Sequence, residues 1–186
     1  MNPGGTDFSR LSLEVADFPP LNAIALQGTE RFSQPFRFEI DIKIPRGYPV
    51  QQLAGQRARL RWQTPDRGAG LRIGVITGGR DLTCAAQPEV ITRLYLEPQL
   101  ALTAKTVHTR VLRGLSLPQL TELILGECGV PRQAIDWRLS GQYPVRDYVL
   151  QAFESNFAFL QRQLAEAGVF YWFEVDAAQR RERLCV

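Results

Sequence analysis

The sequence predicts an α+β fold made mainly of antiparallel strands, with a small β-barrel followed by a strand-helix-strand lobe. Two observations support this class. Before residue 103, apolar and polar residues alternate in a series of short runs, as they do in strands with one buried face. After residue 103, two segments have the apolar spacing and the end signals of helices. We therefore expect a barrel domain over residues 1–102 and a second lobe over residues 103–186.

The first strands are predicted at residues 10–15 and 23–27. The clearest alternation follows at residues 36–44, between Pro35 and Pro45, which cannot donate a hydrogen bond to a neighbouring strand. The apolar positions of this run share one face: Phe36, Phe38, Ile40, Ile42 and Ile44. Because the opposite face is charged, we expect the strand to border a core on one side only.

Three further strands are expected at residues 57–62, 71–77 and 90–96. A longer loop over residues 64–70 should join the first two into a hairpin, and Gly78-Gly79-Arg80 should form a hairpin turn. Roughly six short strands at this spacing are typical of a small antiparallel barrel.

The second lobe should begin near Thr103, with a polar and extended segment at residues 105–111. A helix is predicted from Ser116, which can cap it, through a proline in the first turn. Gly129 is the expected end, because glycine readily adopts the left-handed conformation that ends helices. The apolar stripe of this helix is Leu117, Leu120, Ile124 and Cys128. On such a stripe, Cys128 is expected to be a small core residue.

A second helix is predicted between Ser155 as the cap and Gly168 as the stop. The stripe expected to face the core is Phe157, Leu160, Leu164 and Ala167. The residues expected to face water are Gln161, Arg162, Gln163 and Glu166. Residues 146–154 are expected to form a strand, with one long helix as the alternative. Ser155-Asn156 favours two elements, since both residues suit helix caps better than helix interiors.

An alternating apolar run at residues 169–175 predicts a strand after the second helix. Phe170 to Phe173 could instead form an aromatic binding platform, but packing in a core is favoured directly after a helix stop. Residues 184–186 are apolar and follow a polar turn, which indicates the opening of another strand. We therefore expect this chain to be part of a longer protein.

The segment Tyr143–Glu174 resembles the hallmark stretch of the VgrG family, the trimeric spike proteins of bacterial type VI secretion, which are similar to phage baseplate hub and tail proteins. The resemblance rests on the order Tyr-Pro-x-Arg-Asp-Tyr, an aromatic residue, Glu-Ser, a Phe-Leu helix, and Glu-Ala-Gly-Val-Phe-Tyr-Trp-Phe-Glu. Ala158 departs from it, because the family often has an acidic residue there that closes the capping box. The resemblance implies structural roles for Tyr143, Pro144, Arg146, Tyr148, Glu154, Ser155, Phe159, Leu160, Gly168, Phe170, Tyr171 and Phe173.

Weaker matches extend the resemblance over about residues 10–174. Ser33–Ile40 is similar to the opening of a long barrel strand in the family, and Gln99–Leu102 to the end of another. Gly74 also has its counterpart, although Ile73 stands where an aromatic residue is common. The resemblance implies a phage-hub-like fold and a homotrimer of the full-length protein. That trimer would dock on the secretion tube protein, carry tip or effector proteins, assemble in the cytoplasm and leave through the contractile apparatus without a signal peptide.

Charge and apolar content exclude several other functions. The net charge is +3 and the arginines are scattered, so nucleic-acid binding is not predicted in the absence of a basic helix or stacking platform. No apolar run approaches the length of a membrane span, and residues 1–10 lack the apolar core of a signal peptide. Cys84, Cys128 and Cys185 are odd in number and widely spaced, which indicates reduced thiols rather than a disulfide or metal framework.

No catalytic, cofactor or metal site is predicted. His108 is the single histidine and has no acidic residue within six positions, which disfavours a hydrolytic triad or metal site. Glu39 and Asp41 share a strand face with Arg37 and Lys43, so a charged exterior or subunit contact is favoured over acid-base chemistry. We therefore predict a structural, non-enzymatic component of a secretion spike. A phage or prophage tail hub is the runner-up, and an effector hydrolase or carbohydrate-binding module is the alternative of another class.

Overall fold

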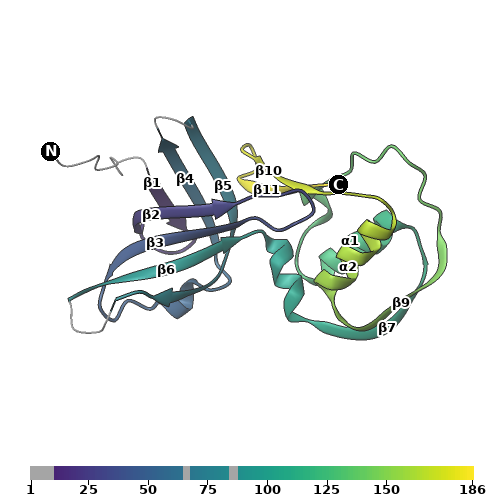
Figure 1. Cartoon of the computed structure of the whole chain (residues 1–186), viewed down its shortest axis with the longest axis horizontal. Helices are drawn as coiled ribbons and strands as arrows, with labels where there is room; N and C mark the ends of the chain where they lie inside the picture. The colour runs from purple at the N-terminus through teal and green to yellow at the C-terminus, as the bar shows by residue number, and fades with distance from the viewer. Residues whose placement is uncertain (1–10, 65–67, 84–87) are drawn as a thin grey trace. The chain divides into compact units, whose positions relative to one another are not determined.

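The chain divides into two compact units in the computed structural model (Figure 1). The residues that the structure describes are 11–64, 68–83 and 88–186. Unit 1 consists of the chain up to Thr29 and Arg37–Glu97, and unit 2 consists of Glu30–Phe36 and Pro98–Val186. Strands dominate the described part of unit 1, and the two α-helices found among the described residues lie in unit 2. The predicted α+β class with mainly antiparallel strands is therefore confirmed.

Unit 1 is built from one six-stranded antiparallel sheet with the order β1-β4-β5-β6-β3-β2. Its strands are β1 (Leu11–Val15), β2 (Asn22–Thr29), β3 (Arg37–Pro45), β4 (Arg57–Thr64), β5 (Gly68–Asp81) and β6 (Glu89–Glu97). The sheet curls so that its edge strands β1 and β2 approach each other. At this point the amide of Leu21, just before β2, donates to the carbonyl oxygen of Leu13 in β1 at 3.2 Å. The result is a curled half-barrel with the short helical turn η2 (Val50–Leu53) after β3.

The two faces of the unit 1 sheet follow the predicted alternation. The side chains that form its core include Leu13, Val15, Phe38, Ile40, Ile42, Ile44, Ala58, Leu60, Leu94 and Leu96. On the charged face, the Arg93 guanidinium donates to Asp41 (Nε to Oδ1, 2.7 Å) and to Glu39 (NH1 to Oε2, 3.0 Å). Glu39 and Asp41 therefore belong to a charged exterior of paired residues.

The turn predicted at Gly78-Gly79-Arg80 is wrong. β5 continues through these residues, and its pairing with β6 shifts register just after Ile76. A Cβ at Gly79 would lie 2.8 Å from the carbonyl oxygen of Arg93. Glycine here permits a close approach of the neighbouring strand rather than a reversal of the chain.

Two smaller expectations for unit 1 also need correction. The loop predicted over residues 64–70 is shorter, because Thr64 already pairs with Gly68 at the start of β5. Phe36 is buried as expected, but it precedes β3 and belongs to unit 2. Cys84 lies outside the described residues.

Unit 2 combines two small sheets with two helices. Its elements are η3 (Gln99–Lys105), β7 (Val107–Leu115), α1 (Leu117–Glu127), η4 (Arg132–Ala134), β8 (Ile135–Asp136), β9 (Arg146–Ser155), α2 (Asn156–Glu166), β10 (Trp172–Asp176) and β11 (Arg181–Cys185). β7 pairs with β9, and β10, β11 and β8 form the other sheet. β9 is a strand, as predicted, and not a helix that continues into α2. The strand end expected at Gln99–Leu102 is wrong, because these residues begin the 3₁₀-helix η3.

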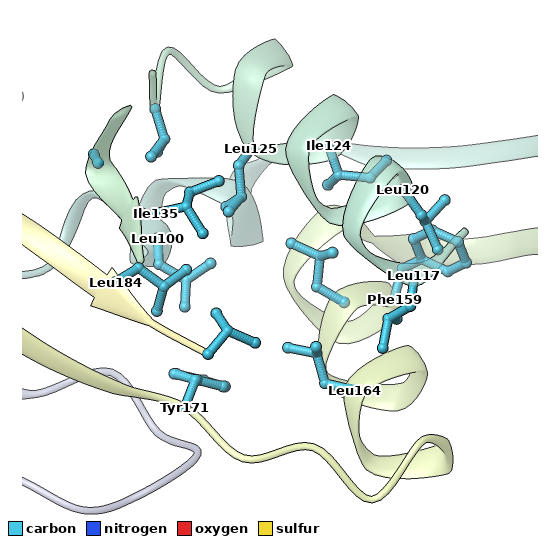
Figure 2. Packing of buried hydrophobic residues seen from close by; sticks show 14 of the residues in the cluster. Leu100, Leu117, Leu120, Ile124, Leu125, Ile135, Phe159, Leu164, Tyr171 and Leu184 are labelled. Carbon is cyan, nitrogen blue, oxygen red and sulfur yellow. The ribbon is translucent and has the colours of Figure 1, made fainter. Parts of the chain in front are cut away.

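Helices α1 and α2 pack against each other and form the centre of unit 2 (Figure 2). The buried cluster includes Leu117, Leu120, Ile124, Leu125, Phe159, Leu160, Leu164, Tyr171 and Leu184. Both predicted caps are present: the amide of Ser116 donates to the side chain of Gln119, and the Ser155 hydroxyl accepts from the amide of Ala158 at 3.1 Å. Cys128 is half-buried at the end of α1 rather than in the core.

The stripe that α2 buries differs from the predicted one. The buried positions are Asn156, Phe159, Leu160, Gln163 and Leu164. They follow the helical spacing i, i+3, i+4, i+7 and i+8, whereas Ala167 is exposed and Phe157 half-buried. Gln163 was expected in water but is 1% exposed, because its amide accepts from Arg146 NH1 at 2.6 Å and donates to Glu166. A buried amide is tolerated when both of its groups are hydrogen-bonded.

Gly168→Val is expected to lower the free energy of unfolding by about 1–2 kcal/mol. Gly168 ends α2 with a φ of +66°, a region that a β-branched residue adopts only with strain. No atom lies within 4 Å of an added Cβ, so the loss should come from the backbone alone. Gly126→Ala in α1, also without a near neighbour, is the control and should not destabilise. An unchanged denaturation midpoint for Gly168→Val would contradict this helix end.

Candidate functional site

The aromatic residues of the VgrG-like motif are used mainly for packing. Phe159, Leu160 and Tyr171 lie inside the core of unit 2, and Tyr143 and Phe173 pack against it. The Tyr171 hydroxyl is buried without a hydrogen-bond partner among the described residues, and burial raises the pKa of that hydroxyl. These positions support the second lobe and offer no reactive group to solvent.

The polar motif residues hold the strand β9 to the helix α2. Arg146 reaches the buried amide of Gln163, and Glu154 forms an ion pair with Arg162. Arg162 also donates to the backbone carbonyl of Leu150 at 3.0 Å. The first contact joins the start of β9 to α2, and the second joins the end of β9 to α2. They hold β9 and α2 together and pair the charges of Glu154 and Arg162, whereas NH2 of Arg146 is buried without a hydrogen-bond partner among the described residues.

Three motif residues point outward instead. Pro144 is exposed, the exposed fraction of Tyr148 is 70%, and that of Phe170 is 57%. For Phe170, the expectation of core packing is therefore wrong. Its ring stacks on Trp172 with centroids 5.9 Å apart, and Phe32 meets both rings edge-on. The alternation predicted for this strand holds, but the face with Phe170 and Trp172 is only partly covered.

A polar network lies between β7, β9 and the two helices, with Gln151 and Asn156 buried and Glu127 exposed. Arg110 binds Glu127 with both terminal nitrogens at 2.7 Å, and its Nε donates to the buried side chain of Gln151 at 2.9 Å. Gln151 also donates to Asn156 at 3.0 Å, and Asn156 donates to the sulfur of Cys128 at 3.7 Å. Each partner satisfies another one, as buried polar groups require. The network joins the end of α1 to the start of α2.

This network has the wrong composition for hydrolysis. The hydrogen bond from Arg110 holds the pKa of the Glu127 carboxyl below its usual range, and the charge of nearby His108 acts in the same direction. A carboxylate held by a bidentate arginine is a weak proton acceptor. The remaining members are two amides and a thiol that accepts a hydrogen bond. The arrangement stabilises structure and supplies no nucleophile paired with a base.

A second charged cluster lies beside the sheet of β8, β10 and β11. Ligand atoms of Asp136, Glu174 and Cys185 come within 4.8 Å of one another, a spacing that a metal ion could bridge. Arg138 already donates to Asp136 at 2.8 Å and to Glu174 at 2.9 Å. Burial raises the pKa of the Cys185 thiol to about 11, which disfavours the thiolate that metals prefer. The cluster is thus an ion-pair network with an arginine as its cation.

Asp176→Asn is expected to lower the melting midpoint at pH 7 and to make it less sensitive to acid. A backbone hydrogen bond from Gln179, and then Arg183, hold the pKa of the Asp176 carboxyl below its usual range. Because the folded pKa is depressed, this stabilisation is present above the unfolded value of about 4 and is lost as pH falls.

Melting curves at pH 7, 5, 4 and 3 test this expectation. The gap between the variant and the original chain should be largest at pH 7 and should narrow toward pH 3. Asp147→Asn is the matched control, because Asp147 is exposed. A gap that stays constant with pH would contradict the assigned cause.

The sheet of β7 and β9 has an apolar side that the sequence analysis missed. Val107, Val111, Tyr148, Leu150 and Phe153 all lie at its surface, with exposed fractions between 49% and 86%. The segment of β7 was expected to be polar and extended, and only the extended conformation is confirmed. The available signal for an apolar face was the placement of Val107 and Val111 at positions that point to the same side of a strand. None of the helices among the described residues has the length and apolar character needed to cross a bilayer.

The chain is similar to spike proteins of type VI secretion. It is 33% identical over 180 residues to the type VI secretion system spike protein VgrG4b of Pseudomonas aeruginosa, covering 95% of this chain and 21% of that protein. This chain therefore spans about a fifth of the length of the curated relatives that it matches.

Solved structures agree with this likeness. The E. coli c3393 protein, a component of the type VI secretion system with structural similarity to T4 bacteriophage tail proteins gp27 and gp5, matches with a TM-score of 0.82 and 27% identity. That match covers 93% of this chain and 48% of the other. A Francisella PdpA-VgrG complex matches with a TM-score of 0.64 and 9% identity, over 97% of this chain and 32% of that one, which shows the fold alone.

The resemblance inferred from the motif between Tyr143 and Glu174 is confirmed by these matches. The model of the family described as phage tail baseplate hub (GPD) matches residues 29–186, which include most of unit 1 and all of unit 2. The chain belongs to the phage tail baseplate hub family.

Proposed function

We propose that this chain forms the N-terminal base of a type VI secretion spike, a trimeric puncturing device that docks on the secretion tube and carries effectors. The observation that carries the proposal is the likeness to VgrG4b over 95% of the chain. The fold of the c3393 protein, itself a component of such a system, supports the same role. In this role the chain transmits force through packed sheets and helices.

We propose that the chain acts without catalysis. The support comes from how its polar side chains are used. Arg110, Glu127, Gln151 and Asn156 satisfy one another, and Arg138 neutralises the carboxylates near Cys185. Within the part of the chain that the structure describes, neither cluster combines a nucleophile with a free base. A hydrolase would need such a pair beside a substrate cleft.

The organisation of the spike base is part of the proposal. We propose a barrel hub domain over residues 1–102 and a second lobe over residues 103–186. The division of contacts between Glu97 and Pro98 supports a boundary close to residue 102, although Glu30–Phe36 belongs to unit 2. The motif residues act structurally, since Phe159, Leu160 and Tyr171 pack in the core. The full-length protein is a homotrimer with the tube protein below it and tip or effector proteins bound to it. It assembles in the cytoplasm and leaves through the contractile apparatus without a signal peptide.

Release of the tube protein into the culture medium tests the spike role. In the bacterium that encodes this chain, the gene is deleted in a strain from which other spike genes have been removed. We expect tube protein to disappear from the medium and to return when the complete gene is restored. Unchanged release in the deletion strain would contradict the proposal. Comparable protein levels in cell extracts serve as the control for expression.

A phage or prophage tail hub is the second candidate, because the matching family model describes a phage tail baseplate hub. The two roles differ in what they require of the cell. A tail hub would be found in phage particles after prophage induction, and its deletion would leave secretion of the tube protein intact. Phage particles containing this protein would favour the second candidate over the first.

A further inference from the structure

The segment between β2 and β3, Glu30–Phe36, belongs to unit 2, although both strands belong to unit 1. We call this segment the strap. Phe36 is buried, and the other six residues are exposed or half-buried. A loop within a hairpin needs only to reverse the direction of the chain. The strap instead binds residues of unit 2, one of them 128 positions away in the sequence.

Two hydrogen bonds hold the middle of the strap. The amide of Ser33 donates to the backbone carbonyl of Tyr171 at 2.7 Å, and Nε2 of Gln161 donates to the backbone carbonyl of Ser33 at 2.9 Å. Both backbone groups of Ser33 are therefore hydrogen-bonded, one to the segment just before β10 and one to α2. These bonds exist only while the strap lies against unit 2, so they report directly on its seating.

One aromatic side chain of the strap contacts the outward side of the segment that follows α2. Phe170 and Trp172 stack on this side with their ring centroids 5.9 Å apart. Phe32 meets both rings edge-on, at 5.8 Å from Phe170 and 6.0 Å from Trp172, a favourable arrangement of aromatic rings. Because Phe32 is 68% exposed, this contact holds the strap without burying it.

The opposite side of the same segment contacts the end of the strap. Tyr171 and Phe173 form an edge-on pair there, with centroids 5.8 Å apart. Phe36 meets Phe173 edge-on at 5.4 Å. Successive side chains of an extended segment point to opposite sides. The strap therefore places one aromatic side chain on each side of residues 170–173.

The strap lies beside an open edge of the sheet of β8, β10 and β11. Within the described residues β10 pairs with β11 alone, so its other edge carries no strand. Unpaired edges present backbone groups that another extended segment can bind, and proteins often cover such edges with a loop. Tyr171 immediately precedes β10, and its carbonyl accepts the hydrogen bond from Ser33. The strap thus covers the beginning of the open edge.

The backbone of Ser33 favours release of the strap. Its φ is +56°, in the left-handed region that residues other than glycine, asparagine and aspartate seldom adopt. The two hydrogen bonds of Ser33 hold this conformation, so leaving the seat relieves strain at the same time as it breaks them. Ser33 is half-buried and its neighbours Phe32 and Gln34 are exposed, which gives water access to the turn. Exposed hydrogen bonds and few buried side chains are typical of segments that open locally.

We propose that the strap is a lid on the beginning of β10 that leaves its seat as one piece while α1 and α2 stay folded. Opening frees the carbonyl of Tyr171 and uncovers the rings of Trp172 and Phe173. The closed lid prevents another extended segment from pairing at this end of the edge. The inference goes beyond the spike role and does not rest on it, since every contact that carries it lies within unit 2.

Native-state hydrogen exchange of the purified chain tests the proposal. Exchange is followed amide by amide with nuclear magnetic resonance, at increasing urea concentrations below the unfolding transition. We expect the Ser33 amide to exchange at least about tenfold faster than the amides of α2 and to depend much less on urea, because opening of the strap exposes little surface. Identical rates and urea dependence for Ser33 and α2 would overturn the proposal, and so would exchange of Ser33 at the rate of an unprotected amide.

Ile124→Val separates opening of the strap from unfolding of unit 2. Ile124 is fully buried on α1, and loss of one methyl group should speed exchange of the α2 amides about twofold to tenfold while the chain stays folded. The Ser33 amide should keep its original rate, because the contacts of Ile124 persist when only the strap opens. Equal acceleration of Ser33 and α2 would mean that the strap opens only with the whole unit, which contradicts the proposal.

Two further variants test the seat itself. Gln161→Ala removes the donor to the Ser33 carbonyl, and Phe32→Ala removes the ring on the outward side. Each should speed exchange of the Ser33 amide about threefold to tenfold, after correction for the changed intrinsic rate beside residue 32, since each loses a contact of the closed strap. Gln179→Ala, at an exposed glutamine between β10 and β11, is the control and should leave the rate unaltered. Unaltered exchange of Ser33 in both seat variants would overturn the proposal.

Discussion

Phe159→Ala is expected to lower the free energy of unfolding of unit 2 by about 3–5 kcal/mol. Phe159 is fully buried in the cluster formed by α1 and α2, near Leu117 and Leu120 (Figure 2). Removing its ring takes away apolar burial and leaves a cavity that two capped helices can fill only partly. Urea denaturation followed by circular dichroism measures the loss, because both α-helices lie in unit 2.

The matched control changes another aromatic residue of the same motif. Phe170 follows α2 and is 57% exposed, so Phe170→Ala should cost less than about 1 kcal/mol. If the motif aromatics served only as a binding platform, the order of the two stability losses would be reversed. Similar losses for the two variants would mean that exposure does not separate the roles of the motif aromatics.

Gly70→Val is expected to lower the free energy of unfolding of unit 1 by about 1–3 kcal/mol. Gly70 lies opposite Trp62 in the pairing of β4 and β5. A Cβ at this position would come within 2.1 Å of two atoms of the Trp62 ring. The indole must then leave the glycine, and its contact with Phe38, at 5.4 Å between ring centroids, would be disturbed. Denaturation monitored by tryptophan fluorescence measures both effects.

The control compares alanine substitutions at two glycines of β5, Gly70→Ala and Gly78→Ala. The nearest atom to a Cβ at Gly78 is Cδ2 of Tyr95 at 3.8 Å, an ordinary van der Waals contact. Gly70→Ala should therefore destabilise unit 1 clearly more than Gly78→Ala. Equal effects would show that the packing of Trp62 on Gly70 contributes little to stability.

The strands of unit 1 could be predicted from the sequence because alternation reports directly on a sheet with one buried face. The alternating isoleucines at positions 40, 42 and 44 gave this signal, and all three are buried in β3. Glycine is ambiguous in the same sequence. The residues Gly78-Gly79-Arg80 read as a turn, but Gly79 instead makes room for β6. A turn and a close approach of strands select the same residue for different reasons.

The side chains of unit 2 were harder to assign, since they depend on which neighbours cover each face. The spacing around Leu160 was compatible with more than one stripe. Arg146, at the start of the strand β9 that leads directly into α2, hydrogen-bonds the buried side chain of Gln163, and the spacing of apolar residues does not report this contact. The alternation after Gly168 correctly placed Tyr171 inside. It could not show that Phe170 on the other face remains exposed, because coverage is a property of the tertiary structure.

The exposed apolar side of the β7–β9 pair illustrates the same limit from the other direction. Val107 and Val111 are weak apolar signals within a polar segment, and the sequence alone does not place them beside Leu150 and Phe153. Only the pairing of β7 with β9 brings these residues onto one surface. Most of the fold could therefore be predicted from local patterns, whereas the exposed apolar side of β7–β9 depends on the pairing of strands that are separated in the sequence.

The mass of the complete protein that contains this chain tests most directly the claim that it is a structural hub of a trimeric spike. Native mass spectrometry gives the number of subunits. It is carried out at concentrations at which sedimentation shows no aggregates. We expect a trimer that persists on dilution, since the proposed hub works through permanent contacts between three chains. A stable monomer or dimer would contradict the account.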